Sequence, residues 1–473
     1  MRMVSRWARA AWLSLLWAAA PALAGPFLVE PYLQLGAAPG PGTLELLWHG
    51  PDRDDPWAVE VRRGLRGPWR PVPRPAWTRV AVSGVEPHRV FAARLAPLAP
   101  GADFAYRVLL AGTPVFLSRA RAPKGPGQPR RVAVLGDLAA GGPAPRELAF
   151  QVYRQHPDLV VLPGDLVYQD GRITEYRKHF YPVYNADRSG PALGAPLLRS
   201  TLTVGALGNH DVGERGPLHP QAAEPDGLAY YLYWDQPLNG PPLAPDGPHA
   251  PPLRPGPDWT WDAFRTAAGA RFPTMGSFSF DAGGVHWTVL DSNRYMDWTD
   301  PALAAWLDQD LARARSAAWR FVVFHHPAFD LAEDNRYLDS WMARIWPVLE
   351  RRRVDLVFTG HIHTYARTRP LRFTPDPAAP GAPPGPVPGR VAWDARFDGR
   401  ARTRARGVIH LITGGGGAHL HLKGRPEPVA KPYVVRIVSQ EHSYSLLDVR
   451  GRRVRFRQLG VDGRELDRFV LAR

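Results

Sequence analysis

Five short segments of the chain carry residue types that bind metal ions, and each follows an apolar run of strand length. They are Gly136-Asp137, Gly164-Asp165-Leu166-Val167-Tyr168, Gly208-Asn209-His210-Asp211, His325-His326-Pro327 and Gly360-His361-Ile362-His363. One such fragment alone is a weak signal, because Gly-Asp after a strand is commonly a turn and a lone His is commonly a buried hydrogen-bonding residue. Five in succession are hard to obtain by chance. Since ligand-bearing residues of α/β sheets gather beyond the carboxyl ends of strands, we expect the five segments to meet at one site.

The donor set of this site limits the metals that it can bind. It holds two carboxylates, one carboxamide, several imidazoles and a phenol, and the chain has no cysteine. Such donors suit iron, manganese or zinc and exclude copper(I) and iron–sulfur clusters. Two ions about 3.5–4 Å apart can hold a water as hydroxide and clamp the attacking and leaving oxygens of a phosphoryl transfer. We therefore expect two metal ions, with Asp165 as the carboxylate that bridges them.

The elements that must position these residues form a layered α/β pattern. Continuous apolar runs of strand length suit strands that are buried on both faces. They span residues 132–135, 159–162, 202–207, 285–290, 321–324, 354–358 and 408–412. Helical patterns lie between several of them, most clearly over 144–155, 301–316 and 338–353. Strands that alternate with helices predict a layered α/β domain.

The first part of the chain has a different pattern. Over residues 25–123, short β-type runs are separated by Pro and Gly turns, which is typical of an all-β sandwich. A Pro- and Gly-rich linker ends this region, so we expect the catalytic domain over 124–473. Two Pro-rich inserts, at about 212–257 and 370–388, interrupt that domain, and loops of this length are usually functional or disordered.

Residues 1–24 have the three parts of a secretory signal: a basic start, a short apolar core and a small-residue cleavage site at Ala22-Leu23-Ala24. A membrane anchor is the alternative. Proline and glycine residues interrupt the second half of the uncharged stretch, however, and a spanning helix needs about 20 mostly apolar residues. We expect cleavage, a mature chain without a transmembrane helix, and a secreted or periplasmic location.

Charge gives a weaker indication of partners. The formal net charge is +15, from 59 basic and 44 acidic side chains. Basic proteins often meet anionic partners, but here the excess is nearly all Arg and is spread along the chain. Only residues 396–406 are dense, with five Arg in eleven residues. We expect a small phosphate ester as substrate and no specific nucleic acid.

In their order, the five segments resemble the motifs of the calcineurin-like metallophosphoesterases, and within them those of the purple acid phosphatases. The family motifs are GD, GDxxY, GNH followed by an acid, VxxH and GHxH, and all five are present here. Pro31-Tyr32-Leu33-Gln34 is similar to the start of the fibronectin-III-like domain of this family. The resemblance implies a β-sandwich followed by a layered, two-sheet α/β metallophosphoesterase domain built on βαβ units.

The resemblance also implies a ligand set. One ion, Fe(III) in the purple enzymes, would be bound by Asp137, Asp165, Tyr168 and His363. The second ion, Fe(II), Zn(II) or Mn(II), would be bound by Asp165, Asn209, His325 and His361. The family places the ligand two residues before a proline, which selects His325 over His326. Ala139 stands where many metallophosphoesterases have a histidine ligand, and a phenolate at Tyr168 would fill that vacancy; the alternative is that Tyr168 only packs.

Catalytic roles follow for the remaining motif residues. His210 and His326 would face the substrate, and His210 could stabilise the transferring phosphoryl group or protonate the leaving alkoxide. Asp211 could orient His210, or both residues could only hold the loop together. His179, His219, His249, His419 and His421 match no motif and are expected at the surface.

The predicted function is that of an exported dinuclear-metal phosphoesterase. It would be an acid-type phosphomonoesterase that hydrolyses phosphate esters with a metal-bound hydroxide. A phosphodiesterase or nucleotidase with the same metals is the nearest alternative. A more distant alternative is a non-catalytic surface-binding protein in which the β-sandwich is the binding domain.

Overall fold

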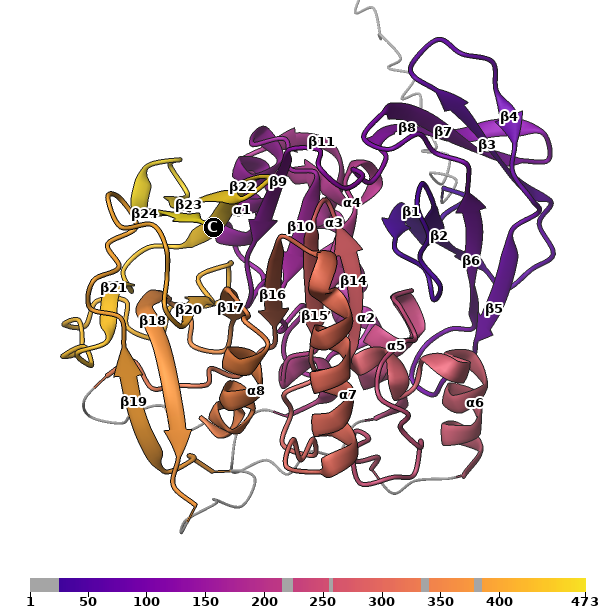
Figure 1. Ribbon diagram of the computed structural model, residues 1–473. Helices are drawn as coiled ribbons and strands as arrows, with labels where there is room; N and C mark the ends of the chain where they lie inside the picture. The colour runs from indigo at the N-terminus through magenta and orange to yellow at the C-terminus, as the bar shows by residue number, and fades with distance from the viewer. Residues whose placement is uncertain (1–24, 215–223, 255–257, 333–339, 378–384) are drawn as a thin grey trace, which may run out of the picture.

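The computed structural model describes residues 25–214, 224–254, 258–332, 340–377 and 385–473 (Figure 1). The predicted signal, residues 1–24, lies outside the described residues. No helix in the described part of the chain is long and apolar enough to cross a bilayer.

The N-terminal part is built from two four-stranded antiparallel sheets, drawn in indigo in Figure 1. One sheet has the order β1(Val29–Gln34)-β2(Leu44–Pro51)-β6(His88–Leu95)-β5(Ala76–Val80), and the other β4(Arg70–Pro71)-β3(Trp57–Arg63)-β7(Asp103–Leu110)-β8(Thr113–Arg121). Aromatic residues of both sheets share one hydrophobic cluster. The Phe91 ring lies 5.3 Å from that of Trp48 and 5.8 Å from that of Trp57, centroid to centroid. The sheets therefore close on each other as the predicted sandwich.

The first sheet of the second part carries three of the predicted site segments. Its order is β13(Thr203–Gly205)-β10(Leu159–Leu162)-β9(Arg130–Val134)-β22(Ser443–Arg450)-β23(Arg453–Gly460)-β24(Glu465–Ala472). The strands β13, β10 and β9 run parallel, whereas β22 to β24 are antiparallel. Parallel strands end at the same edge, so the segments that follow β9, β10 and β13 meet there.

A second sheet faces the first and carries the remaining site segments. Its order is β14(Phe278–Ala282)-β15(Val285–Val289)-β16(Trp319–Val323)-β17(Leu356–Thr359)-β20(Val408–Thr413)-β18(Tyr365–Pro375)-β19(Gly389–Trp393), and β21(Val434–Val438) pairs with β18. The strands β15, β16, β17 and β20 are parallel. Apolar side chains of both sheets form one buried cluster. The two sheets therefore pack face to face around the main core.

Helices cover the outer faces of this pair of sheets. The apolar side of α1(Ala144–Arg154) joins the cluster outside the first sheet, and that of α7(Pro301–Arg313) joins the cluster outside the second (Figure 1). The Asp300 side chain caps α7 by accepting the Ala302 amide at 2.7 Å. The other elements are α2(Ile173–Glu175), α3(Tyr181–Tyr184), β11(Asn185–Gly190), β12(Gly194–Pro196), α4(Leu197–Ser200), α5(Ala229–Tyr233) and α6(Asp258–Ala268). The predicted layered α/β architecture is confirmed.

The helix predicted over residues 338–353 is wrong as one continuous α-helix. In its described part, Trp341–Ile345 is a 3-10 turn and α8 spans only Trp346–Arg351. The cause is Pro347, which has no N–H to donate and whose ring would clash with the carbonyl one turn earlier. Proline is tolerated in the first turn of a helix, so a new helix begins beside it.

Both predicted inserts contain regular structure. Within the first, Tyr230, Tyr231 and Tyr233 of α5 are fully buried, so this segment belongs to the core. Within the second, residues up to Pro375 continue β18, and the pairing of β18 with β20 is irregular before Pro370. Proline cannot donate to a ladder, which accounts for the irregularity.

Candidate metal centre

Three predicted ligands lie at the ends of the parallel strands of the first sheet. Asp137 and Asp165 are buried, and their φ angles are +61° and +51°. Non-glycine residues rarely adopt this left-handed region, and they persist there only when the surrounding structure determines it. At Gly208, a Cβ would lie 2.2 Å from the Asp165 nitrogen, so only glycine lets the Asn209 segment approach Asp165 this closely. The backbone thus fixes the direction of these ligands.

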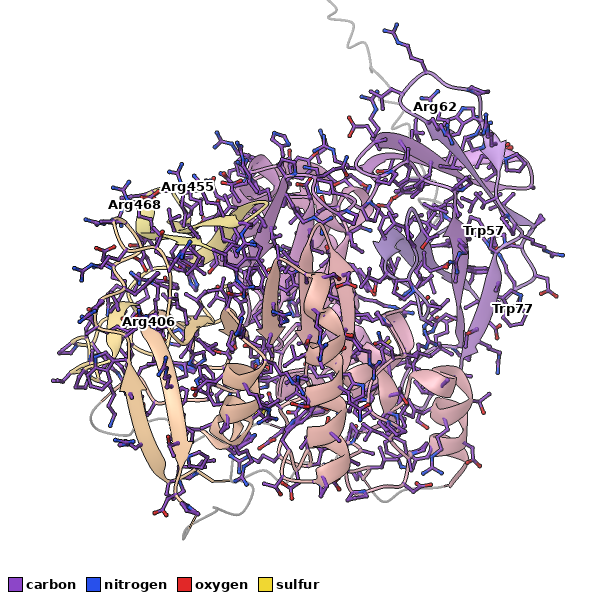
Figure 2. The ribbon with its side chains drawn as sticks, viewed as in Figure 1. Trp57, Arg62, Trp77, Arg406, Arg455 and Arg468 are labelled. Atoms are coloured by element: carbon purple, nitrogen blue, oxygen red, sulfur yellow. The ribbon has the colours of Figure 1, made fainter. Side chains whose placement is uncertain are left out.

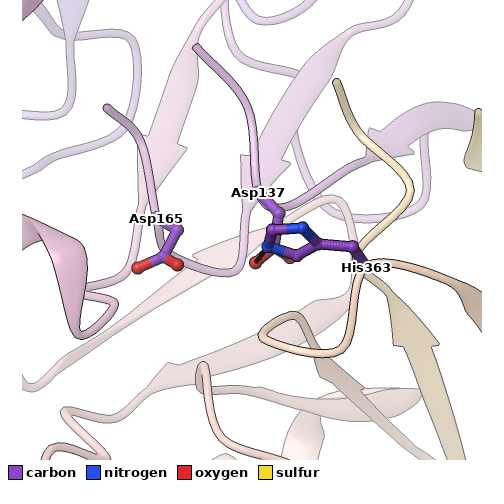
Figure 3. A group of neighbouring side chains, drawn as sticks. All are labelled: Asp137, Asp165 and His363. Carbon is purple, nitrogen blue, oxygen red and sulfur yellow. Dashed lines mark ion pairs between the residues drawn. The ribbon is translucent and has the colours of Figure 1, made fainter. Parts of the chain in front are cut away.

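The first cluster contains the four residues predicted to bind the first ion. One ligand atom each of Asp137, Asp165 and His363 lies within 4.8 Å of the others (Figure 3). The Tyr168 hydroxyl joins them, 3.3 Å from Asp137 Oδ1 and 3.1 Å from His363 Nε2. His363 Nδ1 lies 2.6 Å from the His419 carbonyl and donates to it, so the Nε2 lone pair faces the cluster.

The second cluster contains the residues predicted to bind the second ion. Asn209 Oδ1 lies 3.0 Å from His325 Nε2 and 3.1 Å from His361 Nδ1. Asn209 donates its amide nitrogen to the Glu214 carbonyl at 2.7 Å, which turns its oxygen toward the histidines. His325 Nε2 is also 3.3 Å from Asp165 Oδ2. Asp165 therefore adjoins both clusters, as expected of a bridging carboxylate.

The second cluster attracts positive charge. His325 Nδ1 lies 2.9 Å from the Pro163 carbonyl and donates to it, so His325 Nε2 faces two oxygen acceptors. Burial alone would lower the pKa of His325, but Asp165 raises it to about 9. Burial would raise the pKa of Asp165, yet His325 and His210 hold it below its usual range. A proton or a metal cation must lie between these groups, and hard oxygen and imidazole donors suit iron, zinc or manganese.

Tyr168 stays a phenol unless a strong cation replaces its proton. Burial, and then the charges of Asp165 and Asp137, hold the pKa of Tyr168 well above its ordinary value. Its oxygen nevertheless points at Asp137 and His363 rather than at water. This arrangement fits a hard, highly charged ion in the first cluster.

His210 and Asp211 have separate roles in the structure. His210 is half-buried, its amide donates to Asp165 Oδ1 at 2.9 Å, and its Nδ1 donates to the Gln169 carbonyl at 2.7 Å. Asp211 is fully buried and accepts the amides of Gly208 at 2.8 Å and Leu166 at 3.0 Å. The predicted orienting role of Asp211 is therefore corrected: the Gln169 carbonyl orients His210, and Asp211 joins two site loops.

His326 is almost completely buried beside the second cluster. Its Nδ1 lies 2.9 Å from Ser292 Oγ, and its ring centroid is 4.6 Å from that of His361 and 4.7 Å from that of Trp341. It touches a predicted ligand, and its contact with substrate stays a prediction.

His421 contacts a predicted metal ligand, although it belongs to none of the five motifs. It was expected only as a surface residue, and it is exposed, but its ring stacks on His363 with centroids 3.9 Å apart. The glycine run before it allows this approach, since a Cβ at Gly416 would lie 2.1 Å from the Gly136 carbonyl. A His-x-His pair one residue after such a run is the signal that could have indicated it.

Known proteins resemble this chain in sequence and in fold. Residues 130–365 match the Calcineurin-like phosphoesterase family. The uncharacterized protein Rv2577 of Mycobacterium tuberculosis is 27% identical over 354 residues, which is 70% of this chain and 58% of that protein. Purple acid phosphatase 23 of Arabidopsis thaliana is 34% identical over 108 residues, 22% of this chain and 23% of that protein. The chain thus spans about 58% of the length of its mycobacterial relative.

Two solved structures share the fold. The purple acid phosphatase PPD1 from yellow lupin (Lupinus luteus) seeds aligns with a TM-score of 0.68 and 16% identity, covering 94% of this chain and 74% of that one. The structure of PhoD aligns with a TM-score of 0.55 and 12% identity, covering 96% and 90%. Residues 130–365 therefore form a calcineurin-like phosphoesterase domain, and the chain has a purple-acid-phosphatase-like fold.

Proposed function

We propose that the chain hydrolyses phosphate monoesters at a two-metal centre. The observation that carries this proposal is the convergence of seven donor side chains in two adjoining clusters that share Asp165. They are Asp137, Asp165, Tyr168, Asn209, His325, His361 and His363. Two ions bound there would supply Lewis-acid activation of a water and neutralise charge on the phosphoryl oxygens.

The other residues of the site bind, orient and move a proton. The carbonyls of Pro163 and His419 fix the rings of His325 and His363, so each keeps a lone pair for its ion. His210, fixed through Nδ1 by the Gln169 carbonyl, would hold a proton at Nε2 for the departing alkoxide. Asp211 keeps the loops of Asp165 and Asn209 together.

The proposal includes Fe(III) at the Tyr168 side, with Fe(II), Zn(II) or Mn(II) on the other. It also includes an acid-type pH optimum, a fibronectin-III-like domain over 25–123, a catalytic domain over 124–473 and export by a cleaved signal at 1–24. The direction of the Tyr168 hydroxyl, toward Asp137 and His363, supports iron, because a phenolate oxygen is a hard donor that suits a trivalent ion. The N-terminal pattern supports export, and the resemblance supports the pH optimum.

The test is the metal content per chain together with the visible spectrum and hydrolysis of 4-nitrophenyl phosphate. We expect two ions including iron, and a tyrosinate charge-transfer band that Tyr168→Phe removes. Tyr153→Phe, on α1 and outside both clusters, is the matched control and should keep the band. Asp165→Asn should lose metal and turnover together.

Three other outcomes would change or overturn the proposal. Two ions without iron or colour would withdraw Tyr168 as a phenolate ligand and keep the hydrolase. Failure to retain metal after reconstitution would overturn the enzymatic proposal. Faster cleavage of bis(4-nitrophenyl) phosphate than of the monoester would replace the monoesterase by the phosphodiesterase alternative.

A further inference from the structure

A cavity of about 890 Å³ opens at the edge of the second sheet opposite the metal centre. Its wall includes Trp319 at the start of β16, Asp355 just before β17 and Gly407 just before β20. The metal-site segments follow the other ends of β16 and β17. Because a strand of six residues such as β20 spans about 20 Å, this cavity is a separate place from the metal centre.

The cavity is strongly basic. Seven arginines and only two acidic residues line it. Asp355 is paired with Arg473, whose Nη2 lies 2.6 and 2.7 Å from its two carboxylate oxygens. Glu350, whose Oε1 accepts the Phe373 amide at 2.6 Å, interacts electrostatically with Arg372, so two acids stand against seven arginines. The excess of positive charge is therefore not neutralised from within the wall.

Four of the arginines have guanidinium groups available to a ligand. They are Arg353, Arg372, Arg404 and Arg406, and all four are exposed. Within the described part of the chain, none of these four guanidinium groups makes a hydrogen bond or an ion pair. By contrast, Arg351 Nη2 is bound to Asp308 at 2.7 Å. Like charges gathered in one concave site repel each other, and an anion relieves this cost.

The densest basic stretch of the sequence, residues 396–406, is folded onto this cavity. Asp394 accepts the amides of Arg396 at 3.0 Å and Arg406 at 3.1 Å, which closes the loop. At Gly407, φ is +139° and a Cβ would lie 2.5 Å from the Leu371 carbonyl, so only glycine lets the loop lie against β18. Figure 2 shows Arg406 beside β18 and β20. This approach brings Arg404 and Arg406 to the same cavity as Arg372.

We propose that this basic cavity binds a small oligophosphate, an anion with at least two phosphoryl groups, at a site separate from the metal centre. Guanidinium groups bind phosphate through paired hydrogen bonds, and several of them on one wall match several phosphoryl groups. The volume lies within the range of small-molecule sites. The aromatic residues of the wall, Trp319 and Phe373, are buried and offer no open face for a base. The phosphoryl groups are therefore the part that is recognised.

The test is isothermal titration of the metal-loaded protein with methylenediphosphonate, whose P–C–P bond a phosphoesterase does not cleave. Arg404→Ala/Arg406→Ala should weaken binding at this site about tenfold or more. Arg400→Ala/Arg402→Ala removes the same charge from the same loop but from outside the cavity, and should change it less than about twofold. Asp165→Asn should leave binding at this site in place. Unchanged melting temperatures of the arginine variants would show that they are folded, and Arg372→Ala, on β18, gives an independent check.

Three results would overturn the proposal. If Arg404→Ala/Arg406→Ala and the wild type bound the diphosphonate with equal affinity, the cavity would be excluded as the binding site. Loss of all binding in Asp165→Asn would place the anion in the metal centre. A single-stranded oligonucleotide that binds more tightly than the diphosphonate, with the same dependence on these arginines, would make the cavity a nucleic-acid site instead.

Discussion

His210 and Asp211 are neighbours in the sequence, and their substitution should have different consequences. His210→Ala removes the imidazole that would protonate the leaving group, so kcat should fall about 10²-fold while metal content stays the same. The fall should be larger for an alkyl phosphate than for 4-nitrophenyl phosphate, because the poorer leaving group needs the proton more. Steady-state kinetics on both substrates, with metal analysis, checks this.

Asp211→Ala is the companion variant. It strips the acceptor from the buried amides of Gly208 and Leu166, and each unsatisfied amide costs about 1–3 kcal/mol. A lower melting temperature and loss of metal are expected before any specific effect on the leaving group.

If His210→Ala slowed both substrates equally, His210 would be a positioning residue and not the proton donor.

At the scale of elements, a buried ion pair joins the two sheets of the second part of the chain. Arg367 on β18 binds Asp467 on β24 through Nε at 2.6 Å and Nη2 at 3.0 Å, and the Tyr365 hydroxyl donates to Asp467 at 2.7 Å. Asp467→Ala would leave a buried guanidinium unpaired, which costs about 3–5 kcal/mol. Urea unfolding should show this loss, while Arg468→Ala, an exposed neighbour, should change stability by less than about 0.5 kcal/mol. Equal effects of the two variants would contradict the role of the pair.

Some of the strands and helices could be predicted from the sequence, and others could not. The strand at 159–162 has the same bounds in the structure, because an uninterrupted apolar run ends there in Pro-Gly-Asp. The helix predicted over 338–353 failed at Pro347, where an apolar periodicity continued across a residue that cannot sit in a helix interior. The partners that orient the imidazoles were not predictable. They are backbone carbonyls of Pro163, Gln169 and His419, and a carbonyl group leaves no mark in residue type.

At the scale of the whole molecule, buried histidines lie where the sandwich meets the phosphoesterase-like domain. His88 on β6 is fully buried, with Nδ1 donating to the Glu86 carbonyl at 3.0 Å and Nε2 accepting the Tyr233 hydroxyl of α5 at 2.8 Å. Beside it, the Tyr32 hydroxyl lies 2.9 Å from His49 Nε2 and donates to the Tyr233 carbonyl at 2.7 Å. These contacts connect the two domains through neutral imidazoles.

This interface should weaken in acid. Burial first, and then the charge of Arg177, lower the pKa of His88 from 6.5 to about 4, against smaller opposing effects of the Glu86 carbonyl and Asp52. Below pH 6.5 the unfolded chain binds a proton that the folded chain excludes. Stability is therefore lost as the pH falls toward 4, by about 3 kcal/mol from this group. Thermal unfolding from pH 7 to pH 4 should show the loss, and His88→Gln, which keeps an acceptor for Tyr233, should reduce the slope. An unchanged slope in that variant would exclude His88 as the cause.

If the pH optimum of turnover is acidic, it lies in the pH range where the domain interface is losing stability. The pH profiles of turnover and of unfolding should therefore be measured on the same preparation.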